Sequence, residues 1–338
     1  MHQKKSVAAM IATACAIFLL IIDAKTAFQG AAEGLELCIR TVIPSLFPLL
    51  LLCTVLNSFL TGTSLKILKP MEKLCGIPSG AQSLFLIGIT GGYPVGAKNI
   101  CQAYRNSTLG KADAERLLGF CSNAGPAFLF GMLSLLFPNP AAPWFLWLIQ
   151  ILCAFITGII LPGKTECIGT MKKKQHAGLS EAMQGAINAM ASVCGWIMIF
   201  RVLIRFLNRW VLWLIPKDLA VLLTGFLELS NGCVLLNELQ NHSVRFIAAA
   251  MITAFGGVCV CLQTVSVCRG LSCRIYFIGK LIQAAISVPL SMIFSFFLFP
   301  GNTALLFCGI SLGTCMVIGF LIFRKNKIYT GNSAAYRV

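Results

Sequence analysis

Two hydrophobic stretches of the chain are interrupted where a membrane crossing would lie deepest. The first interruption is residues 91–94 (Gly-Gly-Tyr-Pro) and the second is residues 228–232 (Glu-Leu-Ser-Asn-Gly). Backbone groups that lose their helical partners in hydrocarbon are costly, so such breaks persist only where they face protein or water. The freed amides, hydroxyls and carbonyls can bind a small solute or an ion, and paired breaks in two halves predict a solute-binding site.

Two charged side chains lie at these breaks. Lys98 follows the first break by about one helical turn, and Glu228 is the only carboxylate deep in the second half. A charge within a membrane segment is costly and indicates a functional site. We expect Lys98 to bind a substrate anion or counter-ion, or else to snorkel to the membrane surface. We expect Glu228 to bind a coupling cation or a proton, or to neutralise Lys98.

A second pair of breaks follows, at residues 121–126 and 253–257. Unwound carbonyls and hydroxyls suit hard cations, so Ser122, Asn123 and Glu228 are the candidates for a coupling-ion site. The alternative is that these breaks only kink helices, and that their glycines serve tight turns and close packing. The candidates for substrate binding are Gly92, Tyr93, Pro94, Gly96, Lys98, Asn123, Glu228, Ser230, Asn231, Gly256, Gly257 and Gln263.

The composition predicts an all-α, polytopic membrane protein that holds these breaks in place. Of 338 residues, 57% are hydrophobic and 11% are charged, and the mean hydropathy is +0.84. Runs long enough to cross a bilayer recur along the chain. We predict about eight crossings, near 7–22, 35–60, 112–137, 142–161, 181–200, 244–268, 275–299 and 302–323. The first run also resembles a signal peptide, but we favour a retained crossing.

The distribution of Lys and Arg predicts that both interrupted stretches, 80–105 and 218–238, are re-entrant hairpins. With cytoplasmic termini, this arrangement leaves 18 of the 27 basic residues inside and seven outside. Full crossings would export the basic run 172–174, against the positive-inside rule. The exception is an outer group of Arg201, Arg205 and Arg209, whose spacing beside Trp210 and Trp213 is typical of an interfacial amphipathic helix.

The order of segments repeats once. Gly125 precedes Gly256 by 131 residues, and Gln150 precedes Gln283 by 133. Each unit contains three full crossings and a hairpin, and this odd number of crossings predicts that the second unit is inverted, as in many transporters. We divide the chain into an N-terminal anchor (1–30), a first repeat (31–162, with hairpin 80–105 and broken helix 112–137), a basic cytoplasmic loop (163–180), an inverted second repeat (181–300, with hairpin 218–238 and broken helix 244–268), a C-terminal crossing (301–323) and a basic cytoplasmic tail (324–338).

Enzyme chemistry, a cofactor and a metal site are not expected. The three histidines, at positions 2, 176 and 242, lie in the N-terminus and in predicted loops, and no Cys-x-x-Cys or His-Glu-x-x-His motif occurs. The net charge of +16 is explained by basic cytoplasmic loops and does not indicate nucleic acid.

Several of these segments also resemble a known family. Residues 92–98 (Gly-Tyr-Pro-Val-Gly-Ala-Lys), 122–126 (Ser-Asn-Ala-Gly-Pro) and 228–232 are similar to the sporulation integral membrane proteins of the YlbJ (SpoVV) type. The resemblance spans about 35–300. It implies a Gate, or nucleoside-recognition, domain, related in outline to concentrative nucleoside transporters. It also implies a role in endospore formation, in which dipicolinic acid crosses the outer forespore membrane.

Together these features favour a multi-pass carrier of a small organic anion that works by alternating access. Its partners would be the solute, the lipid bilayer, and other sporulation membrane proteins or a second copy of the chain. Two alternatives stay open: a non-transporting scaffold of the sporulation envelope, and a nucleoside carrier. A scaffold and a carrier differ in whether the polar groups of the four breaks reach one water-accessible cavity.

Overall fold

A computed structural model describes residues 2–60, 68–78, 80–161, 163, 178–299 and 303–335, and all regular elements in this part of the chain are helices. An all-α, polytopic membrane fold is therefore confirmed. Six helices or helix pairs are long and apolar enough to cross a membrane. They span Ala24–Leu60, Ala142–Ile160, Leu179–Trp210, His242–Val267, Arg274–Leu298 and Thr303–Phe320. The predicted loop 163–180 lies almost entirely outside the described residues.

The N-terminal part contains one helix that the sequence pattern does not predict as a separate element. Helix α1 (His2–Ile22) is followed by α2 (Ala24–Leu37), a short π-helical turn (Cys38–Val42) and α3 (Ile43–Leu60). Two glycines of α2, Gly30 and Gly34, lie directly against the backbone of Val202 and Met198 in α10. Any side chain at these glycines would separate the helices, so α2 is a packed helix and not a linker.

The first repeat contains a helical hairpin and a helix that is broken in the middle. Its elements are α4 (Lys69–Cys75), α5 (Gln82–Thr90), α6 (Val95–Arg105), α7 (Lys111–Leu118), α8 (Pro126–Gly131), a 3-10 turn (Leu133–Leu136) and α9 (Ala142–Ile160). Helices α5 and α6 pack against each other, and residues 91–94 form the tip between them. Residues 119–125 are non-helical, so the break between α7 and α8 is seven residues long.

The second repeat likewise has a helical hairpin followed by a broken helix and a long helix. It comprises α10 (Leu179–Trp210), a 3-10 turn (Leu212–Leu214), α11 (Lys217–Leu227), α12 (Leu229–Leu235), a 3-10 turn (Leu236–Glu238), α13 (His242–Phe255), α14 (Gly257–Val267) and α15 (Arg274–Leu298), and α16 (Thr303–Ala335) follows. Helices α11 and α12 form the second hairpin. The break between α13 and α14 is a sharp corner at Gly256 and Gly257, which have φ of +88° and +82°. Glycine adopts these left-handed angles without steric cost.

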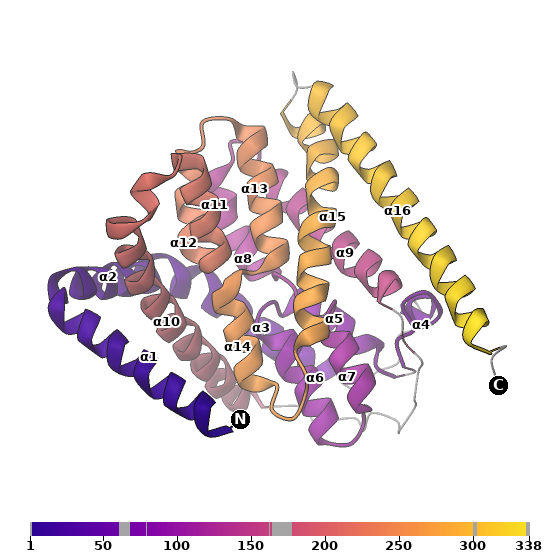
Figure 1. Cartoon of the computed structure of the whole chain (residues 1–338), viewed down its shortest axis with the longest axis horizontal. Coiled ribbons are helices and arrows are strands. Elements are labelled where there is room, and N and C mark those ends of the chain that lie inside the picture. The colour runs from indigo at the N-terminus through magenta and orange to yellow at the C-terminus, as the bar shows by residue number, and fades with distance from the viewer. Residues whose placement is uncertain are drawn as a thin grey trace.

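The two repeats share one core. Helix α15 of the second repeat lies beside α13 in the centre of the molecule and also contacts α9 and α7 of the first repeat (Figure 1). The largest hydrophobic cluster likewise combines side chains of both repeats, including Leu129 and Ile149 with Phe246 and Leu298. Helix α16 packs along α15 at one edge. Because helices of both repeats pack in one core, the broken segments of the two halves lie in the same region.

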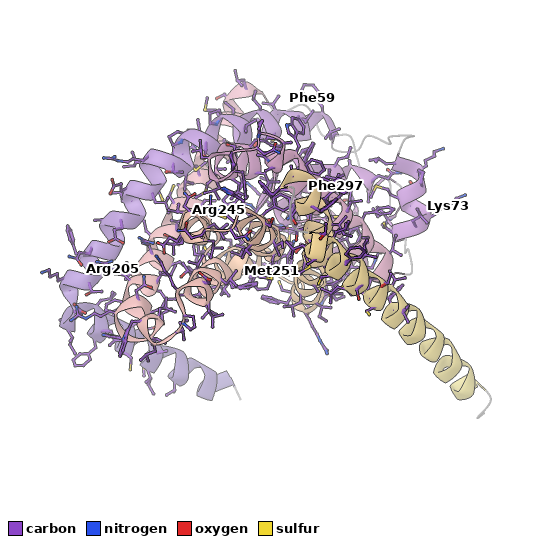
Figure 2. The ribbon with its side chains drawn as sticks, turned by 90° about the horizontal axis from the view of Figure 1, so that it is seen from above. Phe59, Lys73, Arg205, Arg245, Met251 and Phe297 are labelled. Atoms are coloured by element: carbon purple, nitrogen blue, oxygen red, sulfur yellow. The ribbon has the colours of Figure 1, made fainter. Side chains whose placement is uncertain are left out.

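The arginines at the end of α10 bind α2. Arg201 bonds to Glu33 at 2.9 Å, Arg205 lies 3.5 Å from the same carboxylate, and Arg209 bonds to Asp23 at 3.3 Å. Figure 2 shows Arg205 where α10 meets this helix. The three arginines continue the membrane-length helix α10 and do not form a separate interfacial helix. Their charges are locally balanced by carboxylates, which a count of basic residues alone does not reveal.

Candidate functional site

Each hairpin tip packs against the break of its own repeat. In the first repeat, Gly92 at the tip (φ +68°) lies so close to Gly125 in the break that a Cβ on Gly92 would be 2.8 Å from the Gly125 amide nitrogen. In the second repeat, a Cβ on Gly257 would be 3.3 Å from the amide nitrogen of Leu229, at the tip. Small residues therefore allow the four interrupted segments to come together.

A cavity lies where both hairpin tips and the first break meet, and the second break does not line it. It contains about 670 Å³ of space not filled by protein atoms, part of it continuous with solvent. Its wall combines both tips (Gly91, Gly92, Tyr93, Pro94, Glu228, Leu229, Ser230), the first break and α8 (Gly125, Ala127, Phe128), α3 (Leu46, Leu50), α10 (Met190, Val193, Ile197) and α14 (Val260, Gln263). The polar groups of both halves thus reach a common space.

A buried lysine lies behind this wall. The Lys280 side chain in α15 is fully buried, and its ammonium donates hydrogen bonds to the Tyr93 hydroxyl at 2.9 Å and to Gln283 Oε1 at 2.7 Å. It also donates to the backbone carbonyl of Ser122 in the first break, and Asn123 Oδ1 lies 3.5 Å away. The ammonium is 4.9 Å from the centre of the Tyr93 ring, and Tyr93 also lines the cavity.

Two glutamines at equivalent positions of the repeats connect the halves. Gln283 in α15 donates to the carbonyl of Gly119, in the first break, at 3.2 Å. Gln150 in α9 donates to Thr253 Oγ1, beside the second break, at 3.0 Å. Each glutamine therefore binds the broken helix of the other repeat, and the Tyr93 hydroxyl adds a third link by donating to the Thr253 carbonyl at 3.4 Å.

Glu228 is the N-cap of α12. Its carboxylate accepts hydrogen bonds from the backbone amides of Ser230 (3.1 Å) and Asn231 (2.7 Å) and from the side-chain amide of Asn231 (2.7 Å). A carboxylate at a helix N-terminus is favoured by the amides and by the helix dipole. Asn231 Oδ1 in turn accepts from Arg201 at 3.0 Å, so the second tip is tied to α10 and, through Glu33, to α2.

The structure brings most of the predicted site residues into these two networks. Gly92, Tyr93, Pro94, Glu228, Ser230 and Gln263 line the cavity, Ser122 and Asn123 bind Lys280, and Asn231 binds Glu228. Three glycines fill packing roles: Gly96 lies against Cys121 in the first break, Gly256 against the Tyr93 ring, and Gly257 against Gly225 and Leu229.

Lys98 is placed differently from the other candidates. It is exposed on α6, on a face with Gln102 and Arg105, and does not take part in the network around Lys280. Lys280 is a second lysine within a predicted crossing, but no motif around it distinguishes it as a site residue. The signal that could have found it is its position three residues before Gln283, the second of the paired glutamines.

Two short strings of the chain coincide with catalytic patterns. Residues 158–165 match Gly-x4-Gly-Lys-Thr, and residues 309–313 match Gly-x-Ser-x-Gly. A P-loop follows a strand and opens a helix, whereas Gly158 is near the end of helix α9. The second string lies inside helix α16, where no strand-to-helix turn exists. Neither string has the structural context that its chemistry requires. That the chain is not an enzyme stays a prediction.

Comparison with known proteins gives one informative similarity. The chain is 22% identical over 324 residues to the sporulation integral membrane protein YlbJ of Bacillus subtilis (strain 168), an alignment covering 81% of this chain and 79% of that protein. The predicted resemblance to the sporulation integral membrane proteins is confirmed. Searches against family models and solved structures give no match, so the relation to Gate domains and nucleoside transporters stays a prediction.

Proposed function

We propose that this chain is a carrier of a small organic anion across a membrane of the sporulating cell, with dipicolinic acid as the leading candidate. The observation that carries the proposal is the cavity at the meeting point of both hairpin tips and a broken helix. A scaffold has no need for polar breaks that converge on one cavity, whereas an alternating-access carrier needs its binding site between the two repeats.

The charges around the cavity favour an anionic solute. Lys280 bonds only to neutral oxygens among the described residues, so its positive charge is not balanced nearby. A carboxylate at roughly 8 Å, across the Tyr93 ring, would be attracted by about 2 kcal/mol at an effective dielectric constant of about 20. The negative charge of Glu228 is already stabilised by the two amides that it caps.

The shape of the wall favours a planar, aromatic solute. Tyr93 and Phe128 contribute aromatic faces to the cavity, and Ser230 and Gln263 contribute hydrogen-bonding groups. The Lys280 ammonium behind the Tyr93 ring supplies the positive charge that a carboxylate group of the solute requires. Aromatic packing together with carboxylate recognition suits a pyridine dicarboxylate.

Uptake into proteoliposomes tests this function. Wild-type protein should accumulate radiolabelled dipicolinate above protein-free liposomes, and should accumulate a nucleoside much less. Ser230→Trp, which fills the cavity, should abolish uptake. Val234→Trp is the matched control on the same helix because Val234 is 45% exposed, and it should transport like the wild type. Uptake of the nucleoside alone would support the nucleoside carrier. Absence of any uptake by inserted, folded protein would contradict a carrier.

A further inference from the structure

The ammonium of Lys280 has the surroundings of a bound metal cation. Its neighbours are four neutral oxygens: the Ser122 carbonyl, Gln283 Oε1, the Tyr93 hydroxyl and Asn123 Oδ1. They come from the first break, the first hairpin tip and α15. Hard cations such as Na⁺ bind carbonyl, amide and hydroxyl oxygens, and the unwound segments of transporters supply such ligands.

Within the part of the chain that the structure describes, the surroundings of the ammonium provide no counter-charge. The titratable groups that face it are Tyr93, Tyr276, Cys121, Cys153 and Cys261, and none of them is a carboxyl group. All five side chains are uncharged in their ordinary protonated forms. A lysine that served only as an ion-pair partner would have a carboxylate beside it. The neutral oxygens around the first break therefore form a cation-binding site, and the Lys280 ammonium occupies it.

We propose that Lys280 is a built-in cation, which occupies a Na⁺-type site formed by the first break and the first hairpin tip. The side chain enters from α15 of the other repeat and holds the two segments together, as a free ion would. It follows that the wild-type protein has no use for Na⁺ at this site, and that removing the side chain opens the site to a free cation. The binding part of this inference does not depend on transport.

Thermal unfolding of the purified full chain tests the inference. Lys280→Ala should unfold at a lower temperature than the wild type in choline chloride. Replacing choline by Na⁺ or methylammonium at constant ionic strength should raise its midpoint by about 3 °C or more at saturating concentrations, from the linkage between binding and stability. The wild type should shift by less than about 1 °C under the same exchange.

Two variants control for trivial causes. Lys280→Met refills the space with an apolar chain of similar length, so it should show no response to Na⁺. Lys98→Ala removes the exposed lysine of α6 and should behave like the wild type. Adding Asn123→Ala to Lys280→Ala removes one oxygen ligand and should weaken the Na⁺ response several-fold.

The outcomes separate cleanly. A folded Lys280→Ala protein without a cation-dependent shift would overturn the inference, as would an equal Na⁺ shift in the wild type. If Lys280→Ala cannot be recovered in choline, recovery in NaCl or methylammonium chloride supports the inference, and failure in all three salts overturns it. A Na⁺ response in Lys280→Ala without solute uptake by the wild type would leave the inference standing and remove the proposed function.

Discussion

The two repeats share the order of a hairpin followed by a broken helix, but the geometry and the chemistry of their breaks differ. In the first repeat the break is a seven-residue non-helical segment, and its freed carbonyls at Gly119 and Ser122 are bound by Gln283 and Lys280 of the second repeat. In the second repeat the break is a two-glycine corner that leaves little backbone unpaired. The charged group there is Glu228, which caps the hairpin helix beside the break.

This difference shows how two similar repeats become asymmetric. The first tip and break are stabilised by a positive charge that the other repeat supplies, Lys280. The second tip is stabilised by a negative charge of its own hairpin, Glu228. The charged group of the first site therefore comes from the other repeat, whereas the charged group of the second site is local. Substitutions at equivalent positions should consequently have larger effects in the first repeat.

The largest difference is expected at the glycines of the tips and breaks. Gly92→Ala combines a left-handed φ with a contact of 2.8 Å to Gly125, so we expect a loss of about 3 kcal/mol in stability. Gly257→Ala has similar strain but a nearest contact of 3.3 Å, and should lose less. Gly80 has φ of +84°, and no described residue beyond its chain neighbours lies within 4 Å of the point that a Cβ would occupy there, so Gly80→Ala isolates the strain, about 1 kcal/mol. Thermal unfolding in detergent measures all three, and an equal loss at Gly92 and Gly80 would disprove the close contact.

The paired glutamines give the next comparison. Gln283→Leu leaves the Gly119 carbonyl without its partner and removes one acceptor from Lys280, so we expect a loss of about 2–4 kcal/mol. Gln150→Leu removes a single hydrogen bond to Thr253, whose hydroxyl also donates to Ala249, and should lose about 1 kcal/mol. The same unfolding assay compares them. A larger effect at Gln150 would reverse the proposed asymmetry.

Glu228 tests the local character of the second site. Glu228→Gln keeps the shape and one acceptor oxygen but removes the charge, so it should lower transport per inserted molecule and flatten its dependence on pH or Na⁺. Glu238→Gln is the control, since Glu238 belongs to the same hairpin but pairs with Lys217 at the surface. Initial uptake rates between pH 5.5 and 8, with and without sodium, provide the measurement. Wild-type rates and dependences in Glu228→Gln would assign Glu228 a capping role alone.

The smallest effects are expected at the arginines of α10. Arg201→Gln breaks the bond to Asn231 at the second tip as well as the pair with Glu33, and should cost about 1–2 kcal/mol. Arg205→Gln removes a half-exposed ion pair and a long hydrogen bond to Gln29, and should cost less than about 1 kcal/mol. Denaturation of the two variants side by side checks the order. Equal effects would mean that Arg201 does not support the tip.

The breaks could be predicted from the sequence because their glycines, prolines and polar residues interrupt otherwise apolar runs. The equivalence of Gln150 and Gln283 could also be predicted, because both belong to the internal repeat of the sequence. Lys280 was not selected because its segment has no break of its own. Its partners Tyr93 and Ser122 lie 187 and 158 residues away, so only the folded arrangement of the repeats identifies the site. Helix α2 was missed because its polar residues, including Glu33, obscure a helix that packs through glycines.

Accessibility of the cavity tests the central claim, that both halves enclose one alternating site. A single cysteine at position 230, in a variant without native cysteines, should react with a membrane-impermeant thiol reagent added from either side of the membrane, because the site opens to each side in turn. Dipicolinate should slow both reactions. Labelling from neither side, or from one side only and without protection by the solute, would contradict the account.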